Sequence, residues 1–215
     1  MYNSPVVIRL DHIELQGDLV IPDEAVGLVI FSHGSGSSRL SPRNRMVAEH
    51  LWKHRFATLL FDLLTEAEDV NHRNRFNIEL LTHRLIDVTH WARQEDRLKN
   101  LPTGYFGAST GAASALCAAA ELKDAIKAVV SRGGRPDLAV AHLAGVMAPT
   151  LLIVGGWDAE VAELNREALA RIPAEKRLEI IPGATHLFEE PGKLEEVADL
   201  AEEWYRRYLI TSSIM

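Results

Sequence analysis

A serine between two glycines is the first residue whose type and setting suggest chemistry. It lies in Gly107-Ala108-Ser109-Thr110-Gly111, which follows an apolar run and precedes a stretch of small residues that predicts a helix. A serine at a sharp strand-to-helix turn has strained backbone angles, and flanking glycines avoid clashes there. Its hydroxyl is then exposed at a helix N-terminus, which stabilises developing negative charge. Ser109 is therefore a candidate nucleophile, and the alternative is a glycine-rich turn with a surface serine.

A serine hydroxyl is a weak nucleophile and needs a base that is itself oriented by an acid. Asp158 ends the turn Gly155-Gly156-Trp157-Asp158 after one apolar run, and His186 follows the next strand-like segment. Taken singly, Asp158 could be a helix N-cap, and His186 could be an ordinary loop histidine, since the chain has nine histidines. The order Ser, Asp, His, each beyond a different strand, predicts a catalytic triad. Asp137 is the alternative acid.

Acyl transfer also needs two N–H donors that face the oxyanion of the intermediate. We expect one from Thr110, the residue after the nucleophile. The loop His33-Gly34-Ser35-Gly36 follows the first buried run and should supply the other. Ser35 is the preferred donor and Gly36 the second choice, whereas His33 is expected to brace the loop. The alternative is a simple glycine turn.

Alternating strand and helix patterns must position these residues. Continuous apolar runs are typical of strands buried on both faces of a parallel sheet, and they occur at 26–31, 56–61, 104–107, 128–130 and 150–154, with a more exposed strand at 177–181. Near the start, Ile13, Leu15, Leu19 and Ile21 alternate with other residues, which predicts a half-exposed strand that pairs in a hairpin with Val6, Ile8 and Leu10.

Helical spacing separates the runs. The apolar residues at 47–52, 78–88, 161–172 and 194–208 recur with helical periodicity, and 110–121 is rich in alanine. Such alternation predicts an α/β fold with a mostly parallel, doubly wound sheet and helices on both faces. Ligands then bind beyond the carboxyl ends of the strands. The stretch 131–149 has room for one short helix at most, so we expect no lid domain.

Composition limits the remaining classes of protein. A length of 215 residues fits a single domain, 1–215. The net charge of −7 does not favour nucleic acid or anionic membranes as partners. We see neither an apolar run long enough to span a membrane nor a secretory leader, so a cytoplasmic location is expected. The single cysteine, Cys117, excludes an internal disulfide and is expected in the core.

These motifs together resemble the α/β-hydrolase superfamily, in particular its small, lid-less, dienelactone-hydrolase-like group. The matching segments are His33-Gly34-Ser35-Gly36, Gly107–Gly111, Gly156-Trp157-Asp158 and Thr185-His186. The resemblance implies a serine hydrolase that cleaves an ester, a lactone or a related small acyl substrate, without metal or cofactor. The family's namesakes use a cysteine nucleophile, where this chain has Ser109.

Two other classes of function remain open. One is a catalytically silent hydrolase fold used for binding. The other is a nucleotide-binding module, because Gly34 and Gly36 begin a partial G-x-G-x-x-G pattern, although Arg39 replaces the third glycine.

The substrate is less determined than the chemistry. Arginines crowd the expected catalytic edge, at positions 39, 43, 45, 73, 75, 132 and 135. They are either solvated loop charges or ligands for a carboxylate or phosphate on a small-molecule substrate. Gly36 and Arg39 are candidate substrate contacts, and Trp157 and Phe188 are expected either to wall the pocket or to pack the loops. The chain could act as a monomer or as a homodimer.

Overall fold

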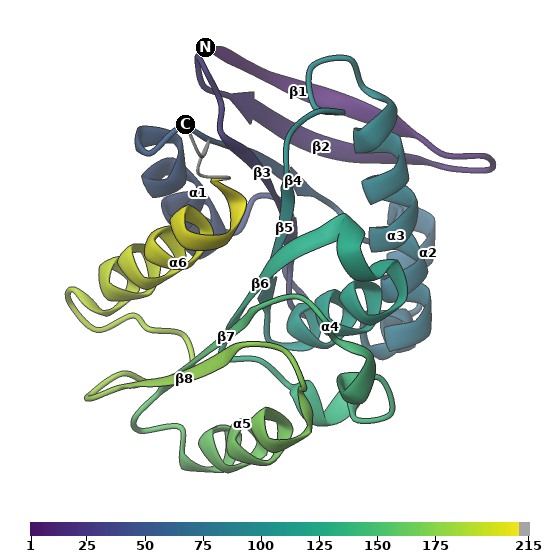
Figure 1. Ribbon diagram of the computed structural model, residues 1–215. Helices are drawn as coiled ribbons and strands as arrows, with labels where there is room; N and C mark the ends of the chain where they lie inside the picture. Colours follow the sequence, from purple (N-terminus) through teal and green to yellow (C-terminus); the bar gives the residue numbers. More distant parts are fainter. Residues whose placement is uncertain (211–215) are drawn as a thin grey trace.

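The computed structural model describes residues 1–210, which form one twisted eight-stranded sheet between layers of helices (Figure 1). The strands lie in the order β1-β2-β4-β3-β5-β6-β7-β8. The strands β1 and β2 are antiparallel to each other, β2 is antiparallel to β4, and the remaining pairs are parallel. Their bounds are Tyr2–Arg9 (β1), Glu14–Ile21 (β2), Gly27–Ser32 (β3), Phe56–Phe61 (β4), Thr103–Ala108 (β5), Ile126–Arg132 (β6), Thr150–Gly155 (β7) and Lys176–Ile181 (β8).

The burial of the strands explains their apolar runs. Every residue of β3, β4, β5 and β7 is buried, because helices cover both faces of the central sheet. The hairpin β1–β2 lies at one edge and alternates in burial, with Ile8 opposite Leu15 in register. The predicted doubly wound sheet and its amino-terminal hairpin are confirmed.

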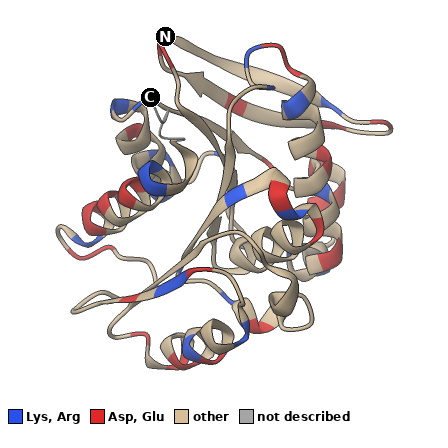
Figure 2. Cartoon of the chain, viewed as in Figure 1, with Lys and Arg blue, Asp and Glu red and all other residues tan. Residues whose placement is uncertain are grey.

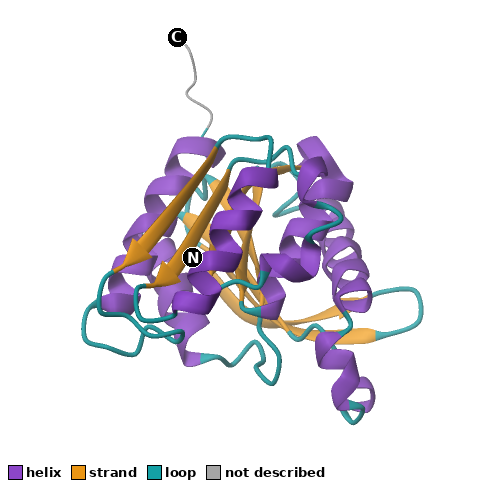
Figure 3. Ribbon diagram, turned by 90° about the horizontal axis from the view of Figure 1, so that it is seen from below, coloured by secondary structure: helices purple, strands orange, loops and turns teal. Residues whose placement is uncertain are grey.

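Helices lie on both faces of the sheet (Figure 3), with one large apolar cluster on each face and a small third cluster around Val154 and Val161. The helices α1 (Pro42–Lys53) and α6 (Lys193–Leu209) cover one face, and α3 (Ile78–Gln94) and α4 (Thr110–Leu122) cover the other. Helix α5 (Ala159–Arg171) packs beside β7 and β8. Figure 2 shows both acidic and basic positions along α3, α5 and α6.

The connections differ in detail from expectation. The stretch 131–149 holds two short 3-10 helices, η3 (Pro136–Ala139) and η4 (Leu143–Gly145), where one short helix at most was predicted. The connection after β4 holds α2 (Glu66–Asp69) and η1 (His72–Phe76), and a further turn, η2 (Lys123–Ala125), follows α4. Within residues 1–210, no inserted lid domain interrupts the sheet, and no helix is long and apolar enough to cross a bilayer.

Candidate active site

Ser109 stands at the sharp turn between β5 and α4. Its backbone angles are φ 52° and ψ −121°, a conformation that side chains rarely adopt. The turn depends on its glycines: a Cβ on Gly107 would collide with the backbone of Ala112, and one on Gly111 would collide with the carbonyl of Ser32. Sequence reasoning anticipated this strain from the G-x-S-x-G spacing, and the alanine-rich helix α4 is buried beneath the turn.

His186 and Asp158 meet across two loops at the same edge of the sheet. Asp158 Oδ2 lies 2.6 Å from His186 Nδ1. An ionised carboxylate can only accept hydrogen bonds, so Nδ1 carries the proton and Nε2 is left as an acceptor. Asp158 also holds the N-cap position of α5, but within the described chain its side chain makes no capping hydrogen bond. The carboxylate is therefore directed to the histidine and away from the helix.

The rival acid lies elsewhere. Asp137 accepts two hydrogen bonds from the Arg135 guanidinium, at 2.8 and 2.7 Å, and this pair holds the pKa of the carboxyl below its ordinary value. Asp137 lines a separate surface cavity together with residues of α5. The geometry thus favours Asp158 as the partner of His186.

The loop that carries His186 is held from both sides. Gly133 has φ +52°, and a Cβ there would lie 3.4 Å from two atoms of the His186 ring. Phe188 is 1% exposed and packs in the core with α1 and α6, so it anchors the loop and does not wall a pocket. Trp157 is 70% exposed, and it is not one of the described residues that line the two cavities beside Ser109. Sequence reasoning missed Gly133, although its place just after a buried strand was a signal.

The loop after β3 approaches the nucleophile closely. A Cβ on Gly34 would lie 3.1 Å from Ser109 Cβ. The Ser35 N–H, one of the two expected oxyanion donors, donates to Thr110 Oγ1 at 2.8 Å. The side chain of Thr110, whose backbone N–H is the other expected donor, therefore occupies the Ser35 amide. Gly36 follows with φ +70°. The structure therefore brings Ser35, Thr110 and Gly36 together, while the Ser35 amide must exchange its partner before it can bind an oxyanion.

His33 braces that loop, as its sequence position suggested. Its Nε2 accepts the Leu63 N–H at 3.1 Å, so Nδ1 is the donor toward the Gly34 carbonyl at 2.9 Å. Burial lowers the pKa of His33 and keeps the ring neutral. Arg39 is fixed in the same way: Asp62 accepts from its backbone N–H at 2.8 Å and its guanidinium at 2.6 Å.

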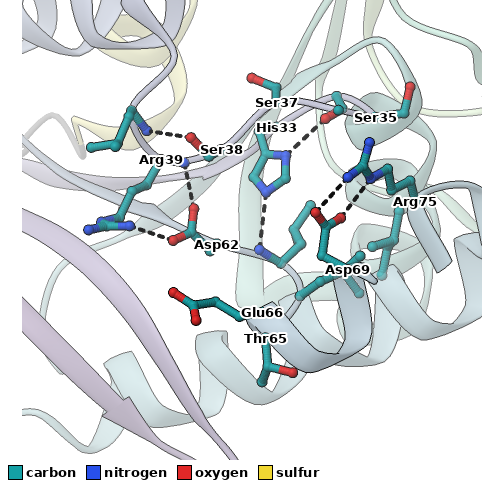
Figure 4. A pocket seen from close by; sticks show the side chains of 16 residues that line it. His33, Ser35, Ser37, Ser38, Arg39, Asp62, Thr65, Glu66, Asp69 and Arg75 are labelled. Atoms are coloured by element: carbon teal, nitrogen blue, oxygen red, sulfur yellow. Dashed lines mark hydrogen bonds and ion pairs between the residues drawn. The ribbon is translucent and has the colours of Figure 1, made fainter. Parts of the chain in front are cut away.

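Two cavities meet at Ser35. One, of about 260 Å³, contains Ser109 and His186 and is also lined by Arg43, Asn44 and Arg132. The other, of about 240 Å³, lies beyond the loop and contains Gly36 and Arg39. Figure 4 shows this second cavity, with Arg39 turned to Asp62 and Arg75 to Asp69. Asn44 was missed by sequence reasoning, because a buried asparagine in a helix has no distinctive pattern.

Residues 1–210 contain no group of three or more histidine, cysteine or acidic side chains placed to hold a metal ion. Cys117 is 4% exposed, and burial raises the pKa of its thiol to about 11. It lies on α4, in the apolar core that α3 and α4 share, away from both cavities.

Comparison with known proteins shows the family to which the chain belongs. The family model described as alpha/beta hydrolase fold matches residues 27–180, which include Ser109 and Asp158. The chain belongs to the alpha/beta hydrolase fold family. The crystal structure of a dienelactone hydrolase from Anabaena variabilis is 53% identical, with a TM-score of 0.94, covering 97% of this chain and 98% of that one. This agrees with the resemblance to the lid-less, dienelactone-hydrolase-like group.

More distant hydrolases share the fold alone. A lid-less α/β serine hydrolase from Xanthomonas campestris is 19% identical, with a TM-score of 0.78, covering 98% of this chain and 96% of that one.

A protein from Mycobacterium tuberculosis, provisionally named a phosphoribosyl transferase, is 58% identical over 197 residues, which are 92% of this chain and 44% of that protein. The chain thus spans less than half the length of this relative.

Proposed function

We propose that this alpha/beta hydrolase is a serine hydrolase that cleaves a carboxylic ester, a lactone or a similar small acyl substrate through an acyl-enzyme. One observation carries the proposal. The strained Ser109 shares a cavity with His186, whose Nδ1 lies 2.6 Å from the Asp158 carboxylate. A nucleophile next to a base that an acid orients is the arrangement that activates a hydroxyl.

In the first half of the reaction, Ser109 Oγ attacks the substrate carbonyl carbon while His186 Nε2 takes the hydroxyl proton. The carbonyl oxygen becomes an oxyanion, for which the backbone N–H groups of Thr110 and of Ser35 or Gly36 are the donors. Asp158 stabilises the imidazolium. When the intermediate collapses, the bond to the leaving oxygen breaks and His186 returns the proton to that oxygen.

In the second half, a water molecule gives a proton to His186 Nε2 and attacks the acyl carbon. The bond from this carbon to Ser109 Oγ breaks, the serine recovers the proton, and the acid product departs. In a lactone, the leaving oxygen and the acid belong to one molecule, so the product is a hydroxy acid. All the groups that move protons belong to this chain, and the proposal requires no cofactor.

The names of the two relatives point in different directions. The dienelactone hydrolase matches this chain from end to end, whereas the provisional transferase extends far beyond it, since the match covers 44% of its length. We attribute the transferase name to the part of that protein that this chain does not cover. The hydrolase proposal is therefore the one that the matched residues support.

The first test is covalent labelling with a fluorophosphonate, followed by peptide mass spectrometry. We expect a single adduct on Ser109, none in Ser109→Ala, and labelling at least 100-fold slower in His186→Ala. Hydrolysis of a panel of nitrophenyl esters and lactones then defines the substrate. If the folded protein takes up no label and cleaves none of the panel, the alternative of a silent hydrolase fold used for binding replaces this proposal.

A further inference from the structure

The arginines at the catalytic edge fall into two groups once their partners are known. Five of the seven have a carboxylate partner: Arg39 binds Asp62, Arg43 binds Glu189, Arg45 binds Asp18, Arg75 binds Asp69 and Arg135 binds Asp137. Figure 4 shows two of these pairs facing the cavity beyond Ser35. In that cavity the basic groups are already neutralised by the chain's own acids, so they have little charge to offer a ligand.

Arg132 is different. It is the last residue of β6, directly beside the nucleophile, because the Ser109 N–H donates to the Arg132 carbonyl at 3.2 Å. The residue is only 7% exposed, and the structure gives its guanidinium one hydrogen bond, from Nη2 to Asn44 Oδ1 at 3.3 Å. Its buried Nε has no hydrogen-bond partner among the described residues. A buried cation without a counter-ion is costly and is expected to be matched by a ligand.

The surroundings of Arg132 suit an anion. The cavity of about 260 Å³ that holds Ser109 and His186 is lined by Arg132, Arg43 and Asn44 and by no acidic residue of residues 1–210. Arg43 reaches toward it from the first turn of α1, which contains no acidic side chain, and its one carboxylate partner is the exposed Glu189 at 3.0 Å. The N-terminus of this twelve-residue helix therefore adds its dipole to two guanidinium groups.

The repulsion between the guanidinium groups of Arg132 and Arg43 also favours an anion at this place. Burial, together with the nearby Arg43, lowers the pKa of Arg132 to about 10, so the group stays charged at neutral pH at an energetic cost. An anion between the two arginines relieves both the burial and the repulsion.

We propose that Arg132, oriented by Asn44 and assisted by Arg43, binds an oxyanionic group of the substrate, a carboxylate or a phosphate, beside Ser109. The inference rests on the proposed acyl chemistry at Ser109 and narrows its substrates to acidic ones. Arginine binds both groups through paired N–H donors, and a cavity of this size admits only a small substrate or the acidic end of a larger one.

The test measures how well small anions protect Ser109 from a fluorophosphonate. Inorganic phosphate and succinate are compared, with the uncharged succinamide as the control ligand. We expect one or both anions to slow labelling of the wild type and succinamide to leave it unchanged. The more effective anion distinguishes phosphate from carboxylate.

Three variants locate the effect. In Arg132→Gln, we expect the anion concentration for half-protection to rise about 10- to 100-fold, the range for one charged hydrogen-bonding partner. Arg43→Gln lies near the surface, so it should fold even if the buried substitution does not, and a smaller rise of about 2- to 5-fold is expected. Arg45→Gln is the matched control on the same helix, and it should protect like the wild type because Arg45 lines a different cavity from Ser109.

The outcomes separate the two proposals. The anion site is overturned if neither anion slows the labelling of Ser109, or if Arg132→Gln and Arg43→Gln both retain the protection. Either result leaves the serine hydrolase proposal intact. If Ser109 takes no label, the proposed function fails instead. Calorimetric titration of the same protein with phosphate and succinate then decides the anion site: binding that Arg43→Gln weakens supports it, and no binding overturns it.

Discussion

The strongest test of the site is the exchange of one carboxylate for an amide, Asp158→Asn. The carboxylate oxygen lies 2.6 Å from His186 Nδ1; the Asp158 side chain is 17% exposed and the His186 side chain 38%, so water screens the pair in part. With charge centres about 4 Å apart and an effective dielectric constant near 20, the carboxylate stabilises the imidazolium by about 4 kcal/mol. This energy corresponds to a rate factor of about a thousand.

The asparagine adds a second defect. Its NH₂ group can donate to Nδ1, which moves the ring proton to Nε2 and removes the base, and the equivalent change in a serine protease costs about 10⁴-fold. We therefore expect kcat/KM of Asp158→Asn to fall by about three to four decades, with little change in the melting temperature because the two side chains have the same size.

The assay is ester hydrolysis in parallel with fluorophosphonate labelling of Ser109. Asp137→Asn is the matched control, since Asp137 pairs with Arg135 and lines a different cavity. This control should stay within about threefold of the wild type. If Asp158→Asn keeps more than a tenth of the activity, or if Asp137→Asn loses as much, Asp158 is not the acid and the electrostatic reasoning fails.

Three further predictions follow from the surroundings of the site. Gly133→Ala should lower kcat/KM by about 10- to 100-fold while costing only about 1 kcal/mol of stability, because the new Cβ lies 3.4 Å from the His186 ring at φ +52°; equal activity in a folded variant would contradict this. Burial lowers the pKa of His33, so its contribution to the free energy of unfolding is complete above about pH 6.5 and is lost as the pH falls toward the folded-state pKa, by at most about 1.4 kcal/mol per pH unit. Urea titrations between pH 7.5 and 5 give the free energy of unfolding of the wild type and of His33→Gln at each pH. Plots of this free energy against pH should differ in slope between the two proteins, and parallel plots would refute the prediction. Cys117 is 4% exposed with a thiol pKa of about 11, so an aromatic disulfide reagent should modify it only in denaturant; rapid reaction in the native protein would show that the core opens around it.

The strand pattern was predictable because burial on both faces leaves continuous apolar runs. The segment 56–61 was predicted with the bounds that the structure gives to β4, and 150–154 falls one residue short of β7. The short turns α2 and η1 were not predicted. They are stabilised by caps and by pairs such as Arg75 with Asp69, which carry no periodic signal.

Phe188 shows why the role of one residue in a loop is harder to predict. Its position two residues after His186 suits either a pocket wall or an anchor. Only the packing of the loop against α1 and α6 directs the ring into the core. The Ser35 amide is a similar case, since its hydrogen bond to the Thr110 hydroxyl joins residues 75 positions apart.

The sequence by itself determined the fold class and the order of the candidate catalytic residues, because apolar periodicity and glycine spacing are local properties of the chain. The tertiary structure alone decided which charges are paired. Asp137 and Asp158 both follow buried strands, and Arg39 and Arg132 both belong to the arginines of the catalytic edge. Yet one aspartate contacts His186, and one arginine is buried without a carboxylate. Pairing depends on distances of a few ångströms between distant segments, and these distances exist only once the sheet has brought its strand ends to one edge.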